Sequence, residues 1–145
     1  MLTIPRSEME VDGSLRDIYV YDIDTQTWNR FLRAVRESNY VNRLVHADQE
    51  LSLKDVDLQT IRHLQETDSV SLYIQVSNQV IAICHFFADD ELELDIDPQE
   101  LGSSKDYTTL LEFLRWLADA LRHTVHLTHE NRPENEILRI EPSCA

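Results

Sequence analysis

The segment at residues 91–97, with the sequence ELELDID, alternates acidic and apolar residues without a break. Successive side chains of a β-strand point to opposite faces, so this spacing predicts a strand with its carboxylates on one face and Leu92, Leu94 and Ile96 on the other. Like charges on one face repel one another, although water and salt screen the repulsion at an exposed site. We therefore expect the acidic face either to lie in water or to meet positive charge.

The simplest interpretation of these carboxylates is a solvated outer face of a half-buried sheet. Of the functions that use several carboxylates, recognition of a basic partner fits best. An EF-hand calcium loop needs a central Gly, and no Gly occurs between residues 89 and 101. A glycosidase pair needs two carboxyl groups across a cleft, which neighbours on one strand do not provide. The predicted partner-binding residues are Asp89, Asp90, Glu91, Glu93, Asp95 and Asp97.

Three histidines with the spacing H-x-x-H-x-x-H are a possible zinc site, because imidazole is a common zinc ligand. His126 and His129 are three residues apart in a predicted strand, so they should point to opposite faces and fail to converge on one metal. His123 is expected to close the preceding helix, where it can interact with the negative end of the helix dipole. We therefore expect no metal and no cofactor.

Other catalytic patterns do not occur in the sequence, which has no G-x-S-x-G, P-loop, G-x-G-x-x-G or C-x-x-C motif. Cys84 and His85 are adjacent in a predicted strand and should face opposite ways, so Cys84 is expected to be a buried structural residue. We predict a non-enzymatic protein. The alternative is a ligand-binding or enzymatic domain, with a pocket between the long C-terminal helix and the sheet and with His85, His126 and Glu130 as its polar groups.

The charge of the chain restricts the partners, since 27 acidic residues face 13 basic ones and the formal net charge is −14. Nucleic acids and anionic membranes require a basic surface, so we expect neither as a partner. A basic protein would be attracted over a long range. With two cysteines, no apolar leader and no long apolar run, the chain is predicted to be cytoplasmic. The oligomeric state is left open.

The elements that position these residues follow from hydrophobic periodicity. We predict strands at 17–23, 69–77, 80–87, 91–97, 124–129 and 136–141, and helices at 26–38, about 55–66 and 107–122. The three middle strands follow one another closely, which predicts an antiparallel meander. Asp106 is expected to cap the last helix, residues 39–54 remain unassigned, and residues 131–135 are expected to form a linker. The predicted fold is α+β: one domain at residues 16–142 after a loose lead-in of residues 1–15, with an antiparallel sheet and helices mainly on one face.

The C-terminal part of the chain, LLEFLRWLADALRHTVHLTHENRPENEILRIEP, combines an amphipathic helix, a short V-x-L-T strand, Glu-Asn, Pro and a final apolar strand. With the small size and the acidity, this pattern, over roughly residues 106–142, resembles immunity proteins of bacterial toxin systems and related small bacterial proteins. The resemblance implies a cytoplasmic, non-enzymatic protein that covers a toxin domain. It carries no diagnostic motif, so no residue role follows from it.

Overall fold

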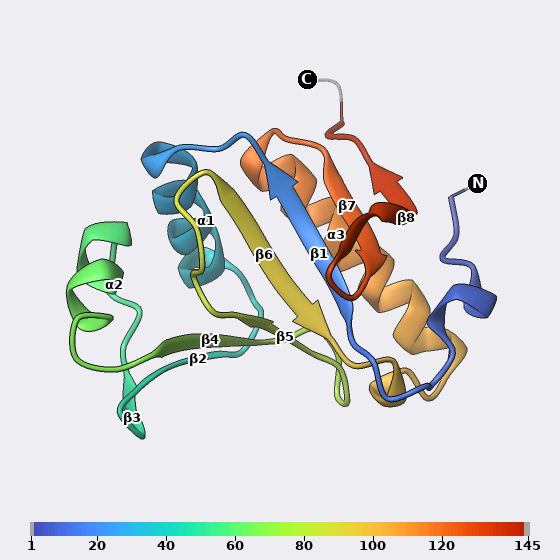
Figure 1. The fold of residues 1–145 in the computed structure, drawn as a ribbon, viewed down its shortest axis with the longest axis horizontal. Coiled ribbons are helices and arrows are strands. Elements are labelled where there is room, and N and C mark those ends of the chain that lie inside the picture. The colour runs from blue at the N-terminus through green and yellow to red at the C-terminus, as the bar shows by residue number, and fades with distance from the viewer. Residues whose placement is uncertain (1, 144–145) are drawn as a thin grey trace.

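The protein has an α+β fold in which helices cover one face of a single eight-stranded antiparallel sheet, as predicted (Figure 1). The computed structural model describes residues 2–143. Its elements are η1 (Arg6–Met9), β1 (Arg16–Tyr21), α1 (Thr25–Glu37), β2 (Asn42–His46), β3 (Gln49–Leu51), α2 (Leu58–Leu64), β4 (Val70–Gln75), β5 (Ile81–Cys84), β6 (Glu91–Ile96), η2 (Pro98–Glu100), α3 (Ser104–Leu121), β7 (Val125–His129) and β8 (Arg132–Ile140).

The strand order in the sheet is β3-β2-β4-β5-β6-β1-β7-β8. Neighbouring β4, β5 and β6 form the predicted meander. The first strand of the chain, β1, lies between β6 and β7 and pairs with both of them antiparallel. This insertion places residues from the start of the chain directly beside the acidic strand.

The helices α1 and α3 lie side by side on one face of the sheet (Figure 1). The apolar stripe of α1 is fully buried, and Asp24 caps this helix by accepting a hydrogen bond from the Thr27 N–H at 2.9 Å. In α3 the cap is Ser103, whereas Asp106 was the predicted cap. Asp106 is the third helical residue and closes a capping box with Ser103. No helix within residues 2–143 is long and apolar enough to cross a membrane.

An unassigned segment and a predicted linker both contain strands. The unassigned residues 39–54 contain the hairpin β2–β3, whose two turn residues, Ala47 and Asp48, both have positive φ angles of 51° and 62°. This two-residue geometry usually takes Asn-Gly, so the residues Ala-Asp carry no signal for it. The predicted linker at 131–135 is wrong, because most of it belongs to β8, where cross-strand bonds to β7 outweigh its polar composition.

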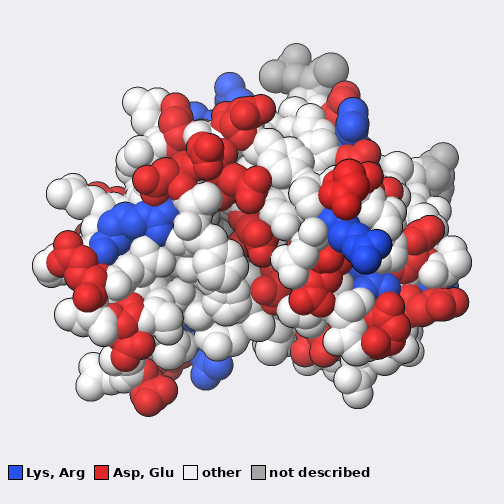
Figure 2. All heavy atoms as spheres, in the orientation of Figure 1, with Lys and Arg blue, Asp and Glu red and all other residues white. Residues whose placement is uncertain are grey.

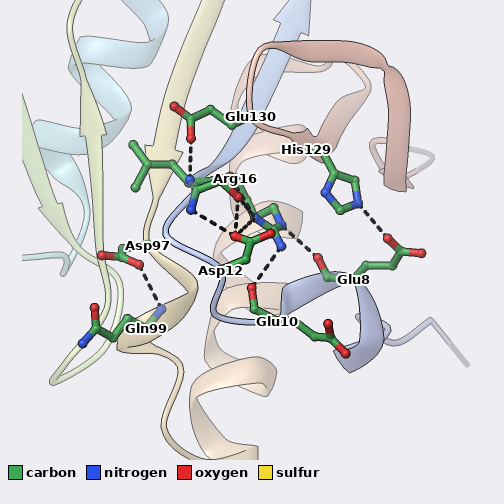
Figure 3. A network of polar contacts seen from close by, with 10 residues as sticks. Glu8, Glu10, Asp12, Arg16, Asp97, Gln99, His129 and Glu130 are labelled. Atoms are coloured by element: carbon green, nitrogen blue, oxygen red, sulfur yellow. Dashed lines mark hydrogen bonds and ion pairs between the residues drawn. The ribbon is translucent and has the colours of Figure 1, made fainter.

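Residues 2–15, expected to be a loose lead-in, contain η1 and contribute the buried side chains of Ile4 and Met9 to the core. Arg16 holds this segment in place (Figure 3). Arg16 is 1% exposed, and its guanidinium donates to the carbonyl oxygens of Glu8 at 2.8 Å and Glu10 at 3.2 Å. Burial with several hydrogen bonds makes Arg16 a polar anchor between the lead-in and the sheet.

Candidate partner-binding face

The face of the sheet opposite α1 and α3 is not covered by a helix of residues 2–143 over β6, β1 and β7 (Figure 1). We call it the open face. Figure 2 shows this side of the molecule, where acidic side chains run as an irregular column down the middle, with the basic side chains mostly apart from it. The strand register identifies the residues that make up the centre of this column.

The predicted alternation of β6 is confirmed. Leu92, Leu94 and Ile96 are buried in the core between the sheet and the helices. Glu91, Glu93 and Asp95 therefore lie on the open face. Each has a β1 residue directly opposite it, and these pairs are Glu91–Tyr21, Glu93–Tyr19 and Asp95–Asp17.

Four carboxylates thus share the open face, and we call Asp17, Glu91, Glu93 and Asp95 the carboxylate column. Asp17 and Asp95 occupy opposed positions on neighbouring strands, an arrangement in which like charges destabilise a sheet. Asp17 is only 2% exposed, and the side chain of Asp95 is 14% exposed. The column is therefore more buried than the solvated surface that a merely soluble sheet face would present.

Burial changes the protonation of these groups, because a charged carboxylate loses water when it is desolvated. Desolvation, with the negative charge of Asp17 next in importance, raises the pKa of Glu93 to about 7. Burial also raises the pKa of Asp17, of Glu91 and of Asp95, the last despite the opposing effect of His85. The open face thus holds carboxylates that lack the positive charge needed to stabilise them.

The protein supplies hydrogen-bond or ion-pair partners to only some of the four carboxylates of the column. Asp17 Oδ2 accepts hydrogen bonds from the Asn131 N–H at 2.7 Å and from the Tyr19 hydroxyl at 3.2 Å. Glu91 and Glu93 make no ion pair with any residue in the described range 2–143. A cation from outside would therefore find two carboxylates free of competing ion pairs.

Two tyrosines lie beside the carboxylates. The rings of Tyr19 and Tyr21 stack with centroids 5.3 Å apart. Burial first, and then neighbouring acids, raise the pKa of the Tyr19 hydroxyl and raise that of Tyr21 to about 12. The Tyr21 hydroxyl is buried and has no hydrogen-bond partner among the described residues. Aromatic rings beside carboxylates suit a cationic group, because a cation is attracted both by the charge and by the ring faces.

His85 links the column to the neighbouring strands. Its Nε2 lies 3.6 Å from Asp95 Oδ2, and its Nδ1 lies 3.0 Å from Ser71 Oγ on β4. The adjacent Cys84 is fully buried on the opposite face, as expected, and burial raises the pKa of its thiol to about 12. Cys84 and His85 therefore cannot act together, and a thiol with this pKa is a poor nucleophile at neutral pH.

The other histidines are separated as the strand geometry predicted. His126 contacts Glu136 on β8 and packs on Tyr21, whereas His129 Nε2 lies 2.7 Å from Glu8 Oε2 in the lead-in (Figure 3). His123 lies at the end of α3, where its Nδ1 is 2.7 Å from the carbonyl oxygen of Leu121. Among residues 2–143, no three His, Cys, Asp or Glu side chains are grouped as a metal site would require.

Three of the six predicted partner-binding residues lie outside the column. Asp89 forms an ion pair with Arg62 of α2 at 2.7 Å, and the exposed Asp90 precedes β6. Asp97 accepts a hydrogen bond from the Gln99 N–H at 3.0 Å and caps η2 (Figure 3). Asp89 and Asp97 thus have structural partners, while Glu91, Glu93 and Asp95 are brought together.

Sequence reasoning missed the β1 half of the face, namely Asp17, Tyr19 and Tyr21. The signal was present, because the segment DIYVY alternates in the same way as ELELDID, with Ile18 and Val20 fully buried on the other side. What the sequence could not supply was the pairing of β1 with β6, whose partner residues lie seventy or more positions apart.

The alternative expectation of a pocket between α3 and the sheet finds no support at the residues of α3 that face the sheet. Leu110, Phe113, Leu114 and Leu117 are all fully buried in close packing. His85 and His126 lie on the open face instead, and the Glu130 carboxylate accepts a hydrogen bond from the Leu15 N–H at 2.6 Å (Figure 3). These polar groups therefore do not line a common helix–sheet pocket.

Comparison with known proteins adds no relative to this geometry: no family model, no curated protein and no solved structure matches the chain.

Proposed function

We propose that the protein is a non-enzymatic binding module whose open face takes a basic protein partner. The observation that carries this proposal is the desolvation of the carboxylate column without compensating positive charge. Partly buried carboxylates are stabilised when a cation pairs with them, so an incoming Arg or Lys would recover free energy that the free protein lacks.

The kind of partner follows from charge and from the pattern of the C-terminal third. With a net charge of −14, the protein attracts basic partners over a long range and speeds their association. The resemblance to immunity proteins supports a basic toxin domain, such as a nuclease, as that partner. Inhibition would then work by occlusion and charge complementarity, in the cytoplasm, without any chemistry on the part of this chain.

The test compares wild-type protein with two variants of equal charge. Glu93→Gln/Asp95→Asn removes two of the four carboxylates of the column, whereas Glu50→Gln/Glu112→Gln removes two exposed carboxylates on β3 and α3 instead. Each is used for affinity capture from native host lysate at low salt, with elution by increasing salt and identification by mass spectrometry.

We expect one basic protein to be captured by the wild type and by the control variant, and to be released as salt rises. The column variant should lose it, chiefly through slower association measured by stopped-flow mixing of the purified pair. Equal capture by all three proteins, or capture that does not respond to salt, would show that the open face is not the binding surface.

One observation favours a second candidate, an esterase-like activity, because Ser71 on β4, His85 directly after β5 and Asp95 on β6 form a chain of polar contacts. His85 could accept the Ser71 proton while Oγ attacks a carbonyl carbon. Two features oppose it. The neighbouring carboxylates would destabilise a developing oxyanion, and the N–H groups of β4 face β2 and β5 in the sheet, not a substrate.

A fluorophosphonate probe separates the candidates. An active Ser71 would attack phosphorus through Oγ and pass its hydroxyl proton to His85 while fluoride leaves, which gives a stable adduct visible by intact-mass spectrometry. Labelling that disappears in Ser71→Ala would establish the nucleophile. We expect no labelling of the wild type.

A further inference from the structure

Three arginines surround a hollow on the helix layer, at the place where α1 passes the C-terminal end of α3. The hollow encloses about 530 Å³ and is lined by Arg30, Arg33 and Glu37 from α1, by Asp119 and Arg122 from α3 and its end, and by Ala34 and Ala120. Its volume lies in the range of pockets that hold small molecules. The alanines are small, which leaves room between the longer side chains.

The arginines differ in what they bind within the protein. Arg30 donates from Nη1 to the Leu121 carbonyl oxygen at 3.1 Å, at the negative end of α3. Arg33 and Arg122 are exposed, and their guanidinium groups make no ion pair or hydrogen bond within residues 2–143. Two guanidinium groups without partners beside one hollow are unexpected in a chain with twice as many acidic as basic residues.

We propose that this hollow binds a phosphate monoester of a small, hydroxyl-bearing molecule. A guanidinium presents N–H groups in a fixed fork that matches phosphate oxygens, and a tetrahedral phosphate has enough oxygens to accept from two forks on different helices. A single carboxylate has only two oxygens and would leave one fork incompletely used.

The acidic residues of the hollow indicate which groups the ligand carries besides its phosphate. Asp119 already accepts from the Ser143 N–H at 2.7 Å, but Glu37 makes no ion pair within the described residues. A carboxylate beside the phosphate site disfavours a second anionic group and favours hydroxyl donors. This site does not use the open face, so its test is independent of the proposed function.

The experiment follows backbone amide shifts of Ala34 and Ala120 by NMR while glycerol phosphate is added, with glycerol and inorganic phosphate as comparison probes. We expect saturable shifts in the millimolar range with glycerol phosphate, weaker ones with inorganic phosphate and none with glycerol. Arg33→Gln/Arg122→Gln should weaken binding about tenfold or more, because it removes charge-assisted hydrogen bonds.

Two control variants separate the parts of the proposal. Arg115→Gln removes the same charge from an exposed position of α3 outside the hollow and should leave the affinity unchanged. Glu37→Gln should weaken glycerol phosphate towards the affinity of inorganic phosphate. Absence of saturable shifts, an unchanged response in the arginine double variant, or equal affinity for both phosphate probes would overturn the proposal.

Discussion

The two faces of strand β6 differ in whether their surroundings suit their side chains. On the covered face, Leu92 and Leu94 are fully buried against apolar side chains. On the open face, Glu93 is partly buried beside other acids, and its pKa rises to about 7. The same strand therefore stabilises the fold on one side and weakens it on the other, which is typical of surfaces kept for binding and not for stability.

Arg16 contrasts with the carboxylate column, because it is a buried charge whose hydrogen bonds are made within the protein. It is the first residue of β1, and its guanidinium donates to four acceptors in the lead-in, which belong to Glu8, Glu10, Ser14 and Leu15. The carboxylate column has no comparable set of donors. The protein thus compensates a buried charge where it serves the fold and leaves charges uncompensated on the open face.

The largest expected effect tests the covered face. Leu94→Ala should destabilise the protein by about 2–5 kcal/mol, because it removes buried methyl groups and leaves a cavity. Urea unfolding followed by circular dichroism measures the change. Glu93→Ala, one residue away on the open face, is the matched control and should not reduce the free energy of unfolding. An equal loss in both variants would remove the distinction between the faces.

The second effect concerns the anchoring charge. Arg16→Met should cost about 2–3 kcal/mol, since part-buried carbonyl oxygens of the lead-in lose a charged donor. The exposed Arg132 on β8 provides the control, and Arg132→Met should change stability by less than about 0.5 kcal/mol. Thermal unfolding of both variants measures the two changes in stability. If Arg16→Met unfolds like the control, the lead-in does not depend on this network.

The third effect depends on pH. A carboxyl group whose pKa is raised in the folded state binds more protons there than in the unfolded chain, so stability falls as pH rises between about 4.5 and 7. Glu93→Gln should therefore stabilise the protein at pH 8 by on the order of 1 kcal/mol, a value reduced by solvent screening. At about pH 4 the difference should vanish.

Urea unfolding of wild type and Glu93→Gln across this range gives the comparison. Glu112→Gln, on the exposed side of α3, should show no such pH dependence. A Glu93→Gln advantage that persists unchanged at low pH would mean that it does not come from the charge of Glu93.

The smallest effect compares the two stacked tyrosines. Tyr21→Phe removes a buried hydroxyl that has no partner among the described residues, so it should leave stability unchanged or raise it slightly. Tyr19→Phe removes a donor to Asp17 and should cost about 1 kcal/mol. Chemical unfolding of both variants measures the difference. The opposite order would indicate that the Tyr21 hydroxyl is the better-bonded of the two.

Local patterns accounted for much of the fold. The alternation of ELELDID, the stripes of α1 and α3 and the close succession of β4, β5 and β6 correctly predicted these elements. The hairpin at Ala47 and Asp48 was not predictable because it lacks the usual turn residues, and β8 was missed in part because its residues are polar. Of the site, the sequence located Glu91, Glu93 and Asp95 but could not place Asp17 opposite them, since register between distant strands is a tertiary property.

The position of β1 between β6 and β7 also bears on how the chain is made. A ribosome delivers β1 before either of its partner strands, since the first of them ends at Ile96 and the second at His129. At typical rates of synthesis the interval before β6 emerges is on the order of ten seconds, far longer than a hairpin needs to form. Throughout it, Ile18 and Val20 have no strand to pair with. The sheet therefore closes only after β7 has emerged, and until then repulsion between negatively charged chains opposes aggregation through these apolar residues.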